Sequence, residues 1–194
     1  MARCLYNSTI REFLQLSPET LLGHFVNNYH GAALTTTNEA WANEIRIMQE
    51  VLQPWMDEDG QVIFEYDIPR LGKRIDVVLL LRGLIFCLEF KVGEREMLQS
   101  NIEQVLDYAL DLKNFHLLSQ NRIIVPILVP TRFRTSSSEF IPSVYDDSMI
   151  RAERSFRNSF PYFQLCGLVS FVPSLMMTIS GRNALASVNS FSCI

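Results

Sequence analysis

The sequence predicts an α/β fold, in which a mixed β-sheet is flanked by helices. Segments with helical and strand-like patterns follow one another between residues 35 and 129 in the order α-β-β-β-α-β. Such an alternation is typical of helices packed against a sheet. The chain has 194 residues, of which 48% are hydrophobic, so it can bury a core without disulfide or metal support.

The first predicted helix begins near residues 35–38, where Thr and Asn side chains can cap the free amides of a first turn. It ends before Pro54, which cannot continue a helix. Glu44 lies on the flank of its apolar stripe, and flanking glutamates are usually solvated. The stripe recurs at helical spacing and consists of Trp41, Ile45, Met48 and Leu52.

Three strands follow, over residues 61–68, 74–81 and 84–91. Glu65 and Asp67 alternate with apolar residues in the first strand, so we expect them on its opposite face, with no role in a site. Only Arg82 and Gly83 separate the second strand from the third, which predicts a tight hairpin.

A long amphipathic helix is expected from about residue 94 to residue 115, followed by a buried strand over 122–129. Pro126 has no amide hydrogen, so it favours an edge or irregular position for this last strand. We expect one main domain over residues 1–150. Residues 151–194 are rich in Ser and Phe without clear periodicity and read as a divergent or truncated tail.

Charge and hydropathy exclude some classes of protein. The net charge of −4 argues against a protein that binds nucleic acid through overall basicity. No apolar run approaches the roughly 20 residues needed to span a bilayer, and residues 1–8 lack the apolar stretch of a secretory signal. We therefore expect a cytoplasmic protein without a membrane partner.

The hairpin predicts a pair of facing carboxylates. A two-residue turn at Arg82-Gly83 pairs Leu81 with Leu84, and the same register places Asp76 opposite Glu89. Like charges held across two strands repel each other. A divalent cation would offset this repulsion, and hard oxygen ligands suit Mg²⁺ or Mn²⁺.

Lys91 lies two residues beyond Glu89 and therefore on the same face of its strand. Two acids and a lysine can hold a metal ion, help to activate a water and stabilise charge on a phosphate. The alternative is a solvated sheet face on which the lysine pairs with an acid. We favour a site, because the neighbouring positions on that face are apolar and isolated buried carboxylates are costly: Val78, Leu80, Ile85 and Cys87.

On the later helix, Gln104, Tyr108 and Asp111 share one face through their i, i+4 and i+7 spacing. Taken alone, they would be an ordinary polar helix surface. Arg70, Lys73 and Arg74 precede Asp76 in the sequence. They are candidates for nucleic-acid contacts through phosphate groups, with solvated surface residues as the alternative.

Three motifs in order resemble the RecB-like branch of the PD-(D/E)XK nucleases: Gly72-Lys73-Arg74-Ile75-Asp76, Glu89-Phe90-Lys91 and Gln104-x-x-x-Tyr108. Over residues 5–130 the chain is more similar still to a nuclease-like domain that precedes a helicase-type ATPase domain in uncharacterised bacterial proteins. The resemblance implies a restriction-endonuclease-like core and metal-dependent hydrolysis of nucleic acid, with DNA as the expected substrate.

The resemblance also implies roles for individual residues. Asp76 and Glu89 would be ligands of Mg²⁺ (or Mn²⁺), with Glu44 as an additional acid. Lys91 would be the catalytic lysine, and Gln104 and Tyr108 would flank it.

The chain departs from this family pattern after the core. No GxxxxGK[ST] motif is present, so ATP use is not predicted, and a helicase-type ATPase would have to be a separate partner. Two alternatives stay open: an inactive nuclease-like module that binds nucleic acid or protein, and a truncated fragment of a nuclease-helicase protein.

Overall fold

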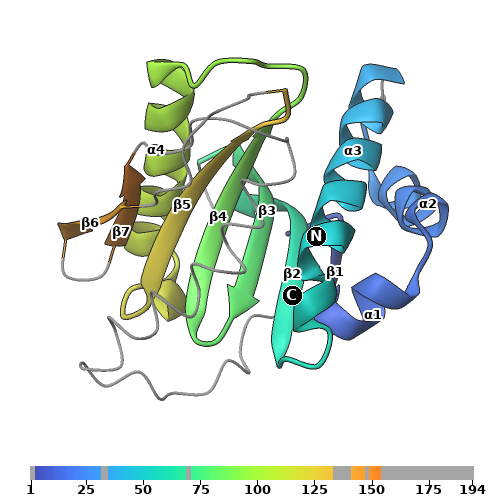
Figure 1. Cartoon of the computed structure of the whole chain (residues 1–194), viewed down its shortest axis with the longest axis horizontal. Coiled ribbons are helices and arrows are strands. Elements are labelled where there is room, and N and C mark those ends of the chain that lie inside the picture. The colour runs from blue at the N-terminus through green and yellow to red at the C-terminus, as the bar shows by residue number, and fades with distance from the viewer. Residues whose placement is uncertain (1–2, 32–34, 69–70, 133–140, 147–148, 154–194) are drawn as a thin grey trace.

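A seven-stranded mixed sheet runs through the computed structural model of this protein, with helices on both faces (Figure 1). The structure describes residues 3–31, 35–68, 71–132, 141–146 and 149–153. The strand order is β1-β2-β3-β4-β5-β7-β6. The strands are β1 (Tyr6–Thr9), β2 (Gly60–Ile68), β3 (Lys73–Leu81), β4 (Leu84–Lys91), β5 (Ile123–Pro130), β6 (Ile141–Asp146) and β7 (Met149–Glu153).

Two hydrophobic cores lie on opposite faces of the sheet. The first is formed with α1 (Ile10–Gln15), α2 (Pro18–Asn28) and α3 (Thr35–Leu52), and the second with α4 (Gln99–Phe115). We call them the α3-side core and the α4-side core. None of the helices in the described ranges is both long enough and apolar enough to cross a membrane.

The predicted order α-β-β-β-α-β is confirmed as α3-β2-β3-β4-α4-β5. The sheet is mixed because β2, β3 and β4 are antiparallel neighbours, whereas β5 returns parallel to β4 after the α4 crossover. The tight hairpin is also confirmed. Arg82 and Gly83 both have positive φ angles, 51° and 79°, as a two-residue hairpin turn of this hand requires.

The region before residue 35 holds elements that the sequence analysis did not assign, namely β1, α1 and α2. Their signals are short and local. Thr9 and Glu12 form a reciprocal capping box at the start of α1, and Ser17 caps α2 ahead of Pro18. These helices place Phe13 and Phe25 in the α3-side core.

α4 begins at Gln99, five residues later than predicted. Backbone hydrogen bonds hold the preceding segment in another conformation, from Glu94 N to Lys91 O and from Arg132 N to Glu94 O. In addition, the Asn101 side chain donates to Glu94 over 2.7 Å. These contacts, including the one with Arg132 just after β5, therefore shift the start of α4 to Gln99.

Of the two alternatives predicted for Pro126, an edge or an irregular position, the edge position is wrong, because β5 lies between β4 and β7. The pairing of β5 with β7 is confined to Ile124 and Met149. Because this ladder does not extend to Pro126, the missing amide hydrogen of Pro126 costs no hydrogen bond to β7. The expected domain boundary at residue 150 falls within β7, and residues 154–194 lie outside the described part.

Candidate functional site

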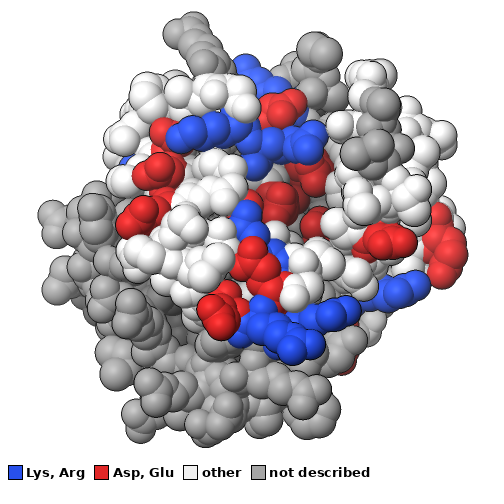
Figure 2. Space-filling model, turned by 90° about the horizontal axis from the view of Figure 1, so that it is seen from above, with Lys and Arg blue, Asp and Glu red and all other residues white. Residues whose placement is uncertain are grey.

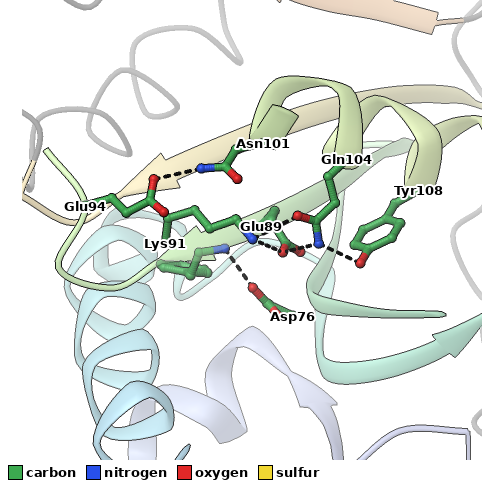
Figure 3. A network of polar contacts seen from close by, with 8 residues as sticks. Asp76, Glu89, Lys91, Glu94, Asn101, Gln104 and Tyr108 are labelled. Atoms are coloured by element: carbon green, nitrogen blue, oxygen red, sulfur yellow. Dashed lines mark hydrogen bonds and ion pairs between the residues drawn. The ribbon is translucent and has the colours of Figure 1, made fainter. Parts of the chain in front are cut away.

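The site lies where β3 and β4 separate. Their ladder follows the predicted register from Leu81–Leu84 to Val77–Leu88 and stops one pair before Asp76 and Glu89. Asp76 and Glu89 do not form a regular ladder pair. The Asp76 carboxylate instead accepts a hydrogen bond of 2.7 Å from the Phe90 amide (Figure 3). The two acids thus meet at the open end of the hairpin.

Lys91 joins β4 to α4 through a polar network (Figure 3). Its ammonium donates to Glu89 Oε1 and to Gln104 Oε1, each over 2.9 Å. Gln104 Nε2 also donates to Glu89 Oε1 over 2.9 Å and to the Tyr108 hydroxyl over 2.7 Å. The structure thus brings together residues from the three sequence motifs, and it fixes the lysine from two sides.

Acidic side chains occupy a central hollow on this end of the molecule, and basic side chains lie on either side of it (Figure 2). Lys73 pairs with Asp111 on α4 over 2.9 Å, and its ammonium lies 6.0 Å from the centre of the Tyr108 ring.

The neighbouring Arg74 lies near other partners. It pairs with Glu65, and its guanidinium lies 5.9 Å from the centre of the Tyr29 ring. Lys73 and Arg74 are both partly exposed, with 41% of each side chain accessible. Arg70, the third predicted nucleic-acid contact, lies outside the described residues.

Glu44 reaches the acidic centre from α3. The sequence suggested a solvated flank, but the residue is only 4% exposed. Its Oε2 atom is buried and accepts no hydrogen bond from the described residues. Packing of α3 on the sheet turns this flank inward, so Glu44 faces the charges of Asp76, Glu65 and Glu89.

Glu65 is a member of the site that the sequence analysis missed. It is 5% exposed, accepts a hydrogen bond of 2.7 Å from the Trp41 indole and pairs with Arg74. Regular alternation placed it on the wrong face, because its φ of 56° interrupts the strand. In the ladder, Glu65 falls between Phe64–Val77 and Tyr66–Ile75 and hence opposite Asp76, a register that the sequence analysis did not assign.

Burial and mutual repulsion raise the pKa values of the carboxyl groups in this centre. Burial and the charge of Glu89 raise the pKa of Asp76 to about 8. Burial and the charge of Asp76 hold the pKa of Glu44 well above its usual range. Burial likewise raises the pKa of Glu89, although the hydrogen bond and the charge of Lys91 oppose that change.

For Lys91, burial lowers the pKa, but the hydrogen bond and charge of Glu89 and the charge of Asp76 outweigh it and raise the pKa overall. The lysine therefore stays charged at neutral pH. Four carboxyl groups (Glu44, Glu65, Asp76 and Glu89) face two basic side chains (Lys91 and Arg74). Full ionisation would leave an excess of negative charge.

We expect the metal-free protein to lose stability as the pH rises from about 4 to about 8. Groups whose pKa is raised on folding bind protons more tightly in the folded state, so their favourable contribution is lost as the pH passes the folded pKa. The pKa of about 8 at Asp76 sets the upper end of this window. Thermal melting in EDTA across this range would measure the decline, and a stability that rose steadily to pH 8 would contradict it.

The residues present fit a divalent cation in their chemistry. Asp76 and Glu89 offer hard oxygens, and Glu89 Oε2 is buried and accepts no hydrogen bond from the described residues. Within the described ranges no set of three or more His, Cys, Asp or Glu side chains is already placed to hold a metal ion. Mg²⁺ does not require one, because it commonly binds one or two carboxylates together with waters and substrate phosphates.

Comparison with protein-family models, curated proteins and solved structures found no match. The chemistry of the site rests on its own residues: the half-buried Asp76 and the buried Glu89 where β3 and β4 separate, a lysine fixed by a glutamine, and two flanking basic side chains.

Proposed function

We propose that this protein is a metal-dependent nuclease that hydrolyses phosphodiester bonds of nucleic acid, with DNA as the expected substrate. One observation carries the proposal. Lys91 Nζ lies within hydrogen-bond distance of Glu89 and Gln104, beside the half-buried Asp76 carboxyl group. An arrangement of two acids and a held ammonium group meets the electrostatic needs of phosphoryl hydrolysis. It also supports the resemblance to RecB-like PD-(D/E)XK nucleases.

Asp76 and Glu89 would hold the cation, with Glu44 near enough to add negative charge. When bound, Mg²⁺ or Mn²⁺ would polarise the phosphate and lower the pKa of a water. The cation would also offset the repulsion between the carboxylates, which otherwise favours their protonated forms.

Lys91 is the residue best placed to stabilise negative charge on the phosphoryl oxygens. Its ammonium keeps a fixed position because it donates a hydrogen bond to Gln104, and Gln104 is itself oriented by Tyr108. A donor held in advance costs no reorganisation when charge develops in the transition state. Gln104 and Tyr108 thus act as positioning residues in this scheme.

Lys73 and Arg74 would contact the nucleic-acid backbone on either side of the acidic hollow. The ion pair of Lys73 with Asp111 is partly exposed, and exposed pairs contribute little to stability. A phosphate can therefore replace Asp111 at low cost, whereas Arg74 would contact a phosphate while it stays paired with the buried Glu65.

The experiment compares cleavage of single-stranded and double-stranded DNA and of RNA, with Mg²⁺, Mn²⁺ or EDTA. We expect cleavage with metal, none with EDTA, and a loss of roughly 10²–10³-fold in Glu89→Gln, which removes the charge of a metal-holding acid. Glu103→Gln is the matched control, because Glu103 is exposed on α4 and bonds only to Gln99 among the described contacts.

Equal activity in Glu89→Gln and Glu103→Gln would contradict the proposal. Binding of nucleic acid without cleavage, independent of metal and unchanged by Glu89→Gln, would instead identify an inactive binding module.

A further inference from the structure

At one position in β2 and β3, the regular alternation of side chains between the two faces of the sheet is interrupted in both strands. Phe64 and Val77 are paired and pack in the α3-side core, whereas the next pair, Tyr66 and Ile75, packs in the α4-side core. Residues two apart on a regular strand share a face. The pair between them, Glu65 and Asp76, is missing from the ladder although the register is kept.

Glu65 holds this irregularity in place. Its φ of 56° lies in the left-handed region, which a residue with a long side chain adopts only when its surroundings impose it. The surroundings here are Trp41, whose indole donates to Glu65 Oε1 over 2.7 Å, and Arg74, which pairs with the other oxygen. Trp41 is itself 1% exposed and lies in the α3-side core, so the anchor is rigid.

Asp76 depends on this irregularity. Strict alternation from Leu80 and Val78, both in the α4-side core, would turn Asp76 toward α4. In the structure, Asp76 instead bonds to the Phe90 amide and lies close to Glu44 on α3. We propose that Glu65, anchored by Trp41, is a positioning residue that directs the Asp76 carboxylate toward the Phe90 amide and Glu44. The positioning role itself does not depend on the proposed function. Only its expected effect on metal binding rests on that function.

Three variants separate the anchor from the charge. Trp41→Phe keeps a buried ring and every charge but removes the indole donor. Glu65→Val removes the anchor, and its branched side chain disfavours a positive φ. Glu65→Gln keeps an oxygen that can accept from Trp41 but removes the charge that pairs with Arg74.

The first readout is the Phe90 amide, observed by NMR in the metal-free protein, with Asp76→Ala as the reference for a lost Asp76–Phe90 hydrogen bond. We expect the Phe90 chemical shift and hydrogen-exchange rate to move toward this reference in Trp41→Phe and Glu65→Val, and to stay near wild type in Glu65→Gln. An unchanged Phe90 amide in both Trp41→Phe and Glu65→Val would overturn the inference, whether or not the protein is a nuclease.

The second readout is the affinity for Mn²⁺. Trp41→Phe and Glu65→Val should weaken binding roughly 10–100-fold, as loss of a residue that orients a metal ligand typically does, and Glu65→Gln should weaken it less. If wild type bound no Mn²⁺ but the Phe90 amide responded as expected, the proposed function would fail while the positioning role would stand.

Discussion

Replacing Lys91 with methionine should lower the rate of phosphodiester cleavage roughly 10²–10³-fold, the usual cost of losing one preorganised donor to the transition state. Methionine keeps most of the length of the side chain but cannot donate to Gln104 or to a phosphate. The turnover rate in metal should fall, and the affinity for Mn²⁺ should not weaken, because both acids remain and a repelling ammonium is gone. Single-turnover cleavage and Mn²⁺ titration measure the two quantities separately.

Lys113→Met is the matched control for this substitution. Lys113 lies in the last turn of α4 and donates to the Arg122 carbonyl, so its loss should leave the cleavage rate near wild type. Comparable rates in the Lys91→Met and Lys113→Met proteins would remove Lys91 from the mechanism.

Asp76→Asn should abolish cleavage while making the metal-free protein more stable. The asparagine oxygen can still accept from the Phe90 amide, so the local hydrogen bond survives. The charge of Asp76 disappears, and with it the cost of burial and the repulsion with Glu89 that raise the pKa of Asp76 to about 8. One pKa unit corresponds to about 1.4 kcal/mol. Because Asp76 keeps some contact with solvent, we expect a gain of about 1–3 kcal/mol at pH 8.

This gain should shrink toward pH 4, where the native carboxyl group is protonated and carries no charge to remove. Thermal melts in EDTA at pH 8 and pH 4 measure both values, with an expected shift of roughly 2–4 °C for each kcal/mol. Asp57→Asn is the control, since Asp57 is 87% exposed and pairs only with Arg11 among the described residues. A metal-free Asp76→Asn protein that melted below wild type at pH 8 would show that the acids do not repel each other.

The parts of the site that were predictable from the sequence depend on local geometry. The Arg82-Gly83 turn fixes the register of β3 and β4, so the approach of Asp76 to Glu89 follows from counting residues. The shared face of Gln104 and Tyr108 follows from the helical repeat.

The rest depends on contacts between segments far apart in the sequence. Glu65 joins the site because Trp41, 24 residues away, stabilises a positive φ inside a strand. Glu44 is buried because α3 packs with that flank against the sheet, and periodicity alone does not define the rotation of a helix that closely. The start of α4 is set by hydrogen bonds of Glu94, one of them with Arg132 just after β5, which no local pattern reports.

The most direct test of the central claim is the amount of Mn²⁺ bound by wild type and by the Asp76→Asn, Glu89→Gln double variant, measured by electron paramagnetic resonance at pH 8. If the two carboxyl groups share a cation, wild type should bind Mn²⁺ in a form that Mg²⁺ displaces, and the double variant should bind none at the same concentration. Equal binding by both proteins, or none by wild type in the presence of nucleic acid, would contradict the metal-dependent mechanism.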